Sequence, residues 1–191
     1  ESRILPAHLR QKDKDDKLGI LDVLVLLNNR EQIDIEVQVT GNEYWAERTL
    51  FYLGKMFVDQ LKPGEDYQKL EKCIHIGILN FTMFEDEEYY SSFHFWSDQG
   101  RKMYSDKIEI HTLELPKLAK YDYPETELLQ WLQFINAETK EEFEMAAGKS
   151  EYIKKAYEDL NRISADEEKR LEYEERERAI RDHQYFSTVY K

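Results

Sequence analysis

The chain has 191 residues and a formal net charge of −13, with 41% hydrophobic and 13% aromatic residues. This size and composition predict one folded domain, or one domain with an appendage, and exclude a disordered chain. The negative charge argues against coating nucleic acid through bulk charge, but it leaves room for an enzyme with a local basic face. The apolar runs are too short to span a membrane, so we expect no membrane partner. The single cysteine, Cys73, excludes an intramolecular disulfide and favours the reducing cytoplasm.

Three regions follow one another along the chain. Residues 1–17 are polar, and we expect an irregular amino-terminal segment there. The chain begins at Glu1 without an initiating methionine, so we also expect that the upstream part of this domain is missing. Residues 18–115 mix strands with one strong helix, and residues 116–191 are predicted to form a helical carboxy-terminal extension.

The middle region begins with two strands, 19–27 and 33–40. Asn28 and Asn29 tolerate the left-handed backbone of the turn between them. Asn42 is a candidate cap for the following helix. The other elements expected in chain order are a helix at 43–61, strands at 73–81, 91–97 and 107–115, and helices at 125–135, 150–163 and 164–184. The apolar run 73–81 is typical of a strand buried on both faces, and Ser164 with Glu167 forms a capping box for the last helix.

The residue pattern of the first two strands predicts their register. Apolar residues occupy odd positions on both strands, and we expect these two sets to share the core face: Leu21, Val23, Val25 and Leu27 with Ile33, Ile35, Val37 and Val39. That arrangement requires paired residues whose numbers have an even sum. It places Asp22, a costly carboxylate in an apolar run, on the same face as Glu36 and Gln38. Pairing about residue 30 sets Asp22 opposite Gln38 and diagonal to Glu36, where two carboxylates could hold one hard divalent cation.

The helix at 43–61 is predicted to carry two different faces. Leu50, Leu53, Phe57 and Leu61 are expected to face the core. Arg48, Tyr52, Lys55 and Asp59 form a stripe on the opposite side, where Arg48 and Lys55 could approach a bound phosphate. The alternative is a plain solvated face in which Asp59 makes a local ion pair.

The histidines and the aromatic residues give weaker indications of a functional site than the carboxylates do. The histidines lack metal-binding spacing, so His75, His94 and His111 are interpreted as ordinary strand residues, and Phe93, Phe95 and Trp96 as packing residues. The sequence contains no nucleophile elbow, phosphate loop or zinc pattern.

Asp22 followed by Glu36-Val37-Gln38 resembles the PD-(D/E)XK nuclease motif. The ordered combination resembles the PD-(D/E)XK nuclease family transposases, also called recombination-promoting nucleases: Leu21–Leu24, Ile35–Gln38, Arg48 with Tyr52, and Gly64–Tyr67. The likeness extends from about residue 18 to residue 183 and includes the acidic helical tail. Leu21 replaces the proline of the motif's name, and Gln38 replaces the usual lysine.

The resemblance implies an α/β fold with a restriction-endonuclease-like core, in which helices flank a mixed β-sheet, plus the helical carboxy-terminal region. It implies a cytoplasmic, Mg²⁺-dependent endodeoxyribonuclease of a transposase family, a hydrolase that acts on phosphodiester bonds in DNA recombination. Mn²⁺ would substitute for Mg²⁺, DNA would be the partner, and two active sites for two strands would call for a homodimer. The implied catalytic residues are Asp22, Glu36 and Gln38, and the implied metal ligands are Asp22, Glu36 and the backbone carbonyl of Val37. Arg48, Tyr52 and Lys55 would bind phosphate or DNA.

Gln38 leaves two functions open. An amide can orient a water molecule, but it cannot carry charge or accept a proton at neutral pH. An active nuclease would therefore need the metal, Arg48 or Lys55 to compensate for the missing lysine. The alternative is a catalytically weak or inactive nuclease-fold module that binds DNA or protein.

Overall fold

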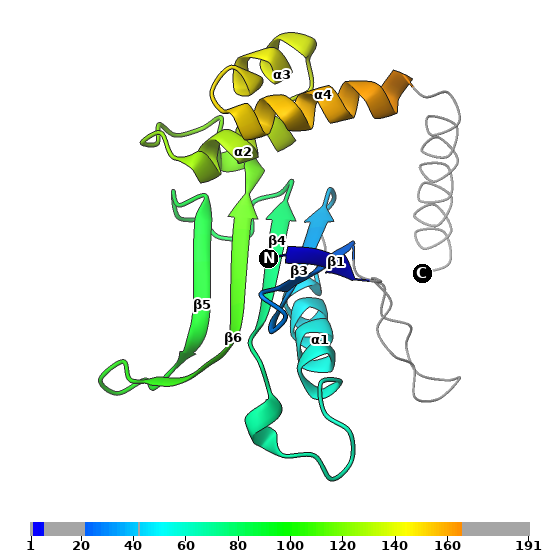
Figure 1. Cartoon of the computed structure of the whole chain (residues 1–191). Coiled ribbons are helices and arrows are strands. Elements are labelled where there is room, and N and C mark those ends of the chain that lie inside the picture. Colours follow the sequence, from blue (N-terminus) through cyan, green and yellow to red (C-terminus); the bar gives the residue numbers. More distant parts are fainter. Residues whose placement is uncertain (1, 6–21, 42, 166–191) are drawn as a thin grey trace, which may run out of the picture. The chain divides into compact units, whose positions relative to one another are not determined.

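The computed structural model describes residues 2–5, 22–41 and 43–165, and the chain divides into two compact units between Tyr123 and Pro124. Within the described part of the first unit, six strands and one α-helix form (Figure 1): β1 (Ser2–Leu5), β2 (Val23–Leu27), β3 (Glu31–Gln38), α1 (Trp45–Val58), β4 (Cys73–Leu79), β5 (Tyr90–Trp96) and β6 (Met103–Glu114). The second unit contains three helices in its described residues: α2 (Glu127–Ile135), α3 (Lys140–Ala147) and α4 (Glu151–Ala165).

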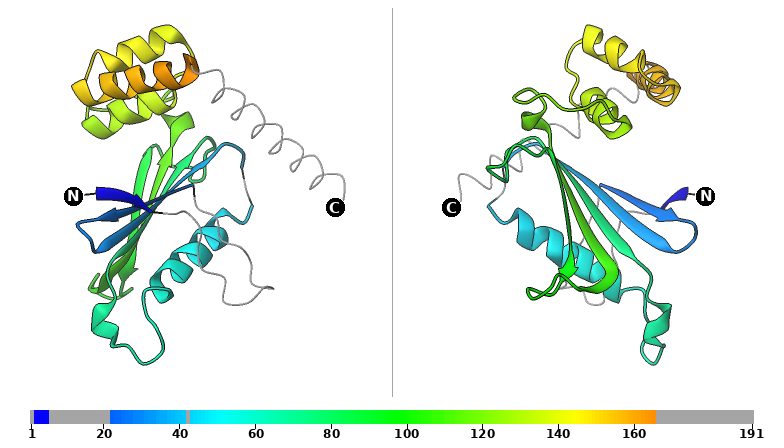
Figure 2. Two further views of the ribbon diagram at one scale, coloured as in Figure 1. Left: turned by 45° about the vertical axis from the view of Figure 1, so that its right-hand side comes forward. Right: turned by 90° about the vertical axis from the view of Figure 1, so that its left-hand side faces the viewer.

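The six strands form one mixed sheet in the order β1-β2-β3-β4-β6-β5. The β3–β4 and β4–β6 pairs are parallel, and the other pairs are antiparallel, which confirms the predicted mixed sheet. Parallel β3 and β4 need a crossover connection, and α1 supplies it along one face of the sheet (Figure 2). The central strand β4 is the most buried of the strands, as its apolar sequence predicted. Cys73 opens it and is fully buried.

Residues 2–5 correct the expectation of an irregular amino-terminal segment. They form β1, which pairs antiparallel with β2 in the register Ser2↔Leu27 to Leu5↔Leu24. The physical reason is that β2 would otherwise be an edge strand with a row of unpaired backbone groups.

The hairpin between β2 and β3 confirms the even-sum register but shifts its centre. Val23 pairs with Ile35 and Leu27 pairs with Glu31, so the hairpin is centred on residue 29 rather than residue 30. Asn28 and Asn29 both adopt the left-handed backbone, with φ of 50° and 58°. This turn places the centre of the hairpin one residue earlier than the sequence predicted, so each β2 residue pairs two residues earlier along β3.

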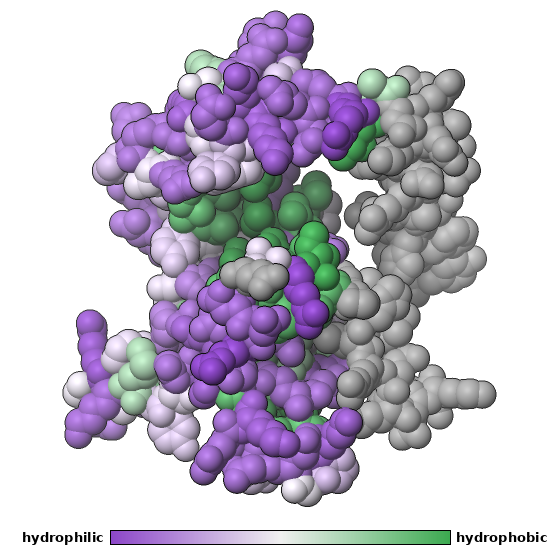
Figure 3. Space-filling view, in the orientation of Figure 1, coloured by the Kyte–Doolittle hydropathy of each residue, from purple (hydrophilic) through white to green (hydrophobic). Residues whose placement is uncertain are grey.

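The face of the hairpin that packs against α1 is the opposite of the one predicted. Asp34 and Glu36 are buried at 0% and 2% exposure, whereas Val37 is 47% exposed. The even-numbered residues therefore lie beneath the helix, where Glu36 meets Arg48 of α1 and Asp34 meets His75 of β4. Figure 3 views the other face of the sheet, where apolar side chains gather between hydrophilic ones.

Helix α1 is rotated relative to the predicted faces. Leu53 is buried as expected, but Leu50 is 54% exposed and Tyr52 is only 5% exposed. Tyr52 joins the core cluster of Leu24, Leu53, Met56 and Cys73. The amino-terminal cap position is Tyr44, without a side-chain capping bond, and the predicted cap Asn42 lies outside the described residues.

The second unit contains the two predicted helices α2 and α4, and also α3, which lies in the region predicted to be helical but was not predicted as a separate helix. A capping box of Thr139 and Glu142 begins α3. The capping role expected for Ser164 is wrong, because α4 continues through Ser164 to Ala165; the rest of the predicted helix 164–184 lies outside the described residues. In the described ranges, no helix combines the length and apolar composition needed to cross a bilayer.

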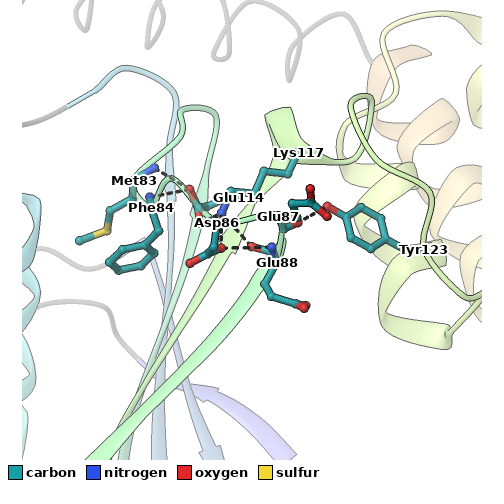
Figure 4. Close-up of polar contacts among 8 residues, drawn as sticks. All are labelled: Met83, Phe84, Asp86, Glu87, Glu88, Glu114, Lys117 and Tyr123. Atoms are coloured by element: carbon teal, nitrogen blue, oxygen red, sulfur yellow. Dashed lines mark hydrogen bonds and ion pairs between the residues drawn. The ribbon is translucent and has the colours of Figure 1, made fainter.

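A buried ion cluster fixes the loop between β4 and β5 (Figure 4). Glu114 at the end of β6 accepts hydrogen bonds from the backbone N–H groups of Met83 and Phe84. Lys117 Nζ donates to three acceptors 2.8–2.9 Å away: Glu114 Oε2, Asp86 Oδ1 and the Glu88 carbonyl. Burial lowers the pKa of Lys117, but the neighbouring carboxylates outweigh burial and raise it overall. The loop fixed in this way also lines an apolar cavity of about 280 Å³ beside Trp45 of α1.

Candidate metal and phosphate site

Glu36 of β3 and Arg48 of α1 form the centre of the candidate site. The Glu36 side chain is 3% exposed, and its Oε1 accepts a hydrogen bond from Arg48 Nη2 at 2.9 Å. The Arg48 guanidinium also lies 5.1 Å from the centroid of the Tyr52 ring, a cation–π contact. Because the Arg48 side chain is 38% exposed, the pair lies between the core and solvent.

The charge on Glu36 is only partly compensated. Burial raises the pKa of its carboxyl, the Arg48 guanidinium opposes that rise, and nearby Asp34 adds to it. Burial lowers the pKa of Arg48, but Glu36, and after it Tyr52 and Asp22, favour its charged form, so the pKa of Arg48 is raised overall. A further cation beside Glu36 would stabilise the ionised carboxylate.

Asp22 lies immediately before β2 and close to Glu36. Its Oδ2 accepts a hydrogen bond from the backbone N–H of Val37 at 2.9 Å. Continuing the observed register by one residue would set Asp22 against Glu36 rather than against Gln38. The structure therefore places Asp22 at the Val37 N–H and beside Glu36, whereas the sequence predicted the Val37 carbonyl as a metal ligand and Gln38 opposite Asp22.

Gln38 is the last residue of β3 and is half-buried. Its Nε2 donates to the Thr40 carbonyl at 2.9 Å, so the amide nitrogen is held along its own strand. This contact orients the Gln38 side chain at the carboxyl end of β3, two residues beyond Glu36 on the same strand.

The three predicted phosphate-binding residues lie in different environments. Arg48 contacts the site directly, and Tyr52 lies beneath it with its ring buried. Lys55 is half-buried in the last turn of α1, about 10 Å farther along the helix axis than Arg48. The structure thus brings Arg48 to Glu36 and does not bring Lys55 there.

Sequence reasoning missed two buried residues beside Glu36. His75 of β4 pairs with Asp34 of β3 in the parallel register, and its Nδ1 lies 2.8 Å from Asp34 Oδ2. Both side chains are fully buried. A signal was present, because a histidine within the apolar run 73–81 needs a polar partner, and Asp34 shares the face of Glu36.

The residues present fit a hard divalent cation. Asp22, Glu36 and the Val37 carbonyl offer oxygen ligands, which Mg²⁺ prefers. In the described residues, Glu36 Oε2 is buried and has no hydrogen-bond partner. Such an orphaned carboxylate oxygen is costly unless an ion or water satisfies it.

The comparisons identify the family. The model of the PD-(D/E)XK nuclease family transposases matches residues 1–188. Searches of curated proteins and of solved structures returned no match. The mixed six-stranded sheet with its helices is consistent with the expected restriction-endonuclease-like α/β fold. Because the matched residues span nearly the whole chain, the protein belongs to the PD-(D/E)XK nuclease family of transposases.

Proposed function

We propose that the protein is a Mg²⁺-dependent DNA endonuclease that hydrolyses phosphodiester bonds in recombination, with Mn²⁺ as a substitute. The observation that carries the proposal is the bond from the Val37 N–H to Asp22 Oδ2, which holds this carboxylate one residue from Glu36. Two carboxylates beside an arginine near the carboxyl end of β3 supply both metal ligands and a phosphate-binding group. The family membership supports the same chemistry.

Each residue has a distinct role in this proposal. Asp22, Glu36 and the Val37 carbonyl hold the cation, which when bound polarises the phosphate and lowers the pKa of a water ligand. Arg48 lies beside Glu36 and is partly exposed, so it can transfer its hydrogen bond from Glu36 Oε1 to a phosphate oxygen of incoming DNA. That transfer leaves Glu36 Oε1 available as a ligand.

Gln38 orients the attacking water through its amide. Because a neutral amide takes no proton, the proton of the water passes to a phosphate oxygen or to solvent. Arg48 supplies the positive charge that lysine provides elsewhere in the motif, since Lys55 lies too far along α1. We therefore expect DNA cleavage to be slower than in a nuclease that has the motif's lysine at this position, and the rate of cleavage to depend strongly on Arg48.

The second candidate is a nuclease-fold module that binds DNA or protein without efficient cleavage. Two observations favour it: Arg48 occupies Glu36 Oε1, and the Gln38 amide nitrogen is bonded to Thr40. The net charge of −13 also limits binding to a local basic site.

A plasmid-nicking assay separates the two functions. With Mg²⁺ or Mn²⁺, the wild type should nick supercoiled DNA, and Asp22→Asn or Glu36→Gln should slow nicking by about 100-fold or more. Glu31→Gln is the matched control, because Glu31 lies at the other end of the same strand and should leave the rate unchanged. Equal nicking by wild type and both site variants would refute the assignment and indicate a contaminating nuclease. No nicking together with a DNA mobility shift would support the binding module.

We also propose DNA as the partner, the cytoplasm as the compartment, and a homodimer for cutting two strands. The buried, reduced Cys73 suits a reducing compartment. The dimer follows from the need for two sites on two strands, and sedimentation with and without duplex DNA tests it.

A further inference from the structure

Asp34, Glu36 and His75 form a second cluster of candidate ligands beneath Arg48. One ligand atom from each residue can be chosen so that all three lie within 4.8 Å of one another. The three residues are 0%, 2% and 0% exposed. Asp34 and Glu36 come from β3 and His75 from β4, so the paired strands fix the cluster.

Hydrogen bonds within the described residues do not satisfy this cluster. Asp34 Oδ1 and Glu36 Oε2 are both buried without a hydrogen-bond partner. Each such oxygen costs free energy unless a water or an ion binds it. Arg48 bonds only the Glu36 carboxylate among the three side chains, so two buried carboxylates share one permanent cation. A cation bound beside Asp34 Oδ1 and Glu36 Oε2 would therefore supply both the missing positive charge and the missing partners of these oxygens.

The imidazole of His75 is held in an orientation that suits a ligand. Its Nδ1 lies 2.8 Å from Asp34 Oδ2, and Thr49 Oγ1 lies 3.4 Å from Nε2. A carboxylate that accepts one ring N–H of a histidine fixes the tautomer and leaves the other nitrogen for a metal. The Nε2 atom also faces Gly77, the residue paired with Glu36: a Cβ built on Gly77 would lie 3.4 Å from it.

Trp45 and Arg48 close the cluster. The Trp45 ring lies 5.7 Å from His75, centroid to centroid, and Trp45 is 4% exposed. Arg48 is the more exposed of these two side chains and bonds Glu36 from the solvent side. Arg48 is therefore the partly exposed partner of the otherwise buried Glu36.

We infer that Asp34, Glu36 and His75 bind a borderline divalent transition ion of the Mn²⁺, Co²⁺ or Zn²⁺ class, at a position distinct from the oxygen-only position of Asp22. An imidazole nitrogen with carboxylate oxygens favours these ions, whereas Mg²⁺ prefers oxygen ligands alone. Glu36 is common to both positions. The inference goes beyond the proposed nuclease function, because ion binding here requires no DNA cleavage.

Cobalt binding to the whole chain tests the inference. Calorimetry and visible absorption of Co²⁺ should show one His75-dependent ion per chain, and millimolar Mg²⁺ should leave it bound. His75→Gln or Asp34→Asn should weaken Co²⁺ binding about 10-fold to 100-fold. Asp22→Asn should leave it unchanged. His94→Gln is the matched histidine control, since His94 lies on β5 against Glu109.

Two results would overturn the inference: no Co²⁺ uptake by the wild type, or equal uptake by wild type and His75→Gln. The second would mean that Asp34 and His75 form a buried ion pair only. Circular dichroism establishes whether each variant is folded. If His75→Gln fails to fold, wild-type crystals soaked in Co²⁺ decide the matter by anomalous diffraction: a peak beside His75 supports the site, and peaks only elsewhere exclude it.

The proposed nuclease function is tested independently of the proposed Co²⁺ site, because DNA nicking and Co²⁺ binding are measured separately. Asp22→Asn should abolish Mg²⁺-dependent nicking while Co²⁺ still binds. Loss of Co²⁺ binding in Asp22→Asn, with retention in His75→Gln, would reject the second position and keep the first.

Discussion

Replacing Lys117 with methionine tests the energetics of the buried ion cluster. Methionine has a similar length but no charge, so Glu114 would remain buried beside only the two backbone donors of Met83 and Phe84. The side chains of Lys117 and Glu114 are each 1% exposed, whereas that of Asp86 is 55% exposed. Removing one partner of a buried ion pair costs about 3–5 kcal/mol. We expect about 3 kcal/mol, because the exposed Asp86 lets solvent approach one side of the ammonium group.

Urea unfolding at 25 °C, followed by tryptophan fluorescence and circular dichroism, measures this loss. Asp86→Asn is the control, and it should reduce the free energy of unfolding much less than Lys117→Met does. The double variant Glu114→Gln/Lys117→Met should be more stable than Lys117→Met, since it removes the unpaired charge. The reasoning would be refuted if Lys117→Met costs less than about 1 kcal/mol, or if Asp86→Asn costs as much.

Three further predictions concern residues around the site. Gly77→Ala should lower the free energy of unfolding by about 1–3 kcal/mol, because its Cβ would lie 2.8 Å from Trp45 Cζ2; urea titration measures it. Cys73, whose pKa burial raises from 9.0 to about 11, should resist iodoacetamide in the folded protein at pH 8. The thiol of the unfolded chain ionises at lower pH than the buried thiol. The free energy of unfolding should therefore fall by about 3 kcal/mol as the pH rises from the lower pKa of 9.0 to the higher pKa of about 11. Cys73→Ala should lack that loss. Arg48→Met should raise the pKa of the Glu36 carboxyl, since the guanidinium now opposes the effect of burial; ¹³C NMR of the carboxyl measures it.

Each of these predictions has its own control. Gly54→Ala in α1 should stabilise the protein, because the added Cβ meets no atom within 4 Å apart from its chain neighbours and the adjacent backbone of α1, and alanine favours the helix. Iodoacetamide should modify Cys73 rapidly in urea. An unchanged or lower Glu36 pKa in Arg48→Met would mean that the ion pair contributes nothing in solution.

The elements of the sheet were predictable because their patterns are local. Alternation marks β3, and a continuous apolar run marks β4, so both strands were confirmed within a few residues. Even-sum pairing also followed from local parity. The even-sum pairing requires only that the polar residues of β2 and β3 lie on one face of the sheet. It does not depend on whether that face is buried or exposed.

The direction of that polar face could not be predicted from the hairpin alone. Apolar odd-numbered residues predict an apolar core face, yet Glu36 is buried because Arg48 reaches it from α1. Asp34 is buried because His75 lies beside it on β4. These partners are distant in sequence, and no local period reveals a carboxylate that is neutralised from another element. Functional sites are where such conflicts between pattern and burial are expected.

Under the proposed function, the turn at Asn28 and Asn29 makes loop length a determinant of metal binding. If the turn kept its length, deleting Arg30 or inserting one residue would slip the pairing of the two strands by one residue and turn Asp22 away from Glu36. Every residue of the candidate site would remain in the sequence. If the proposed metal site is correct, a chain with such a slipped register should keep its strands but no longer bind the metal at Asp22 and Glu36.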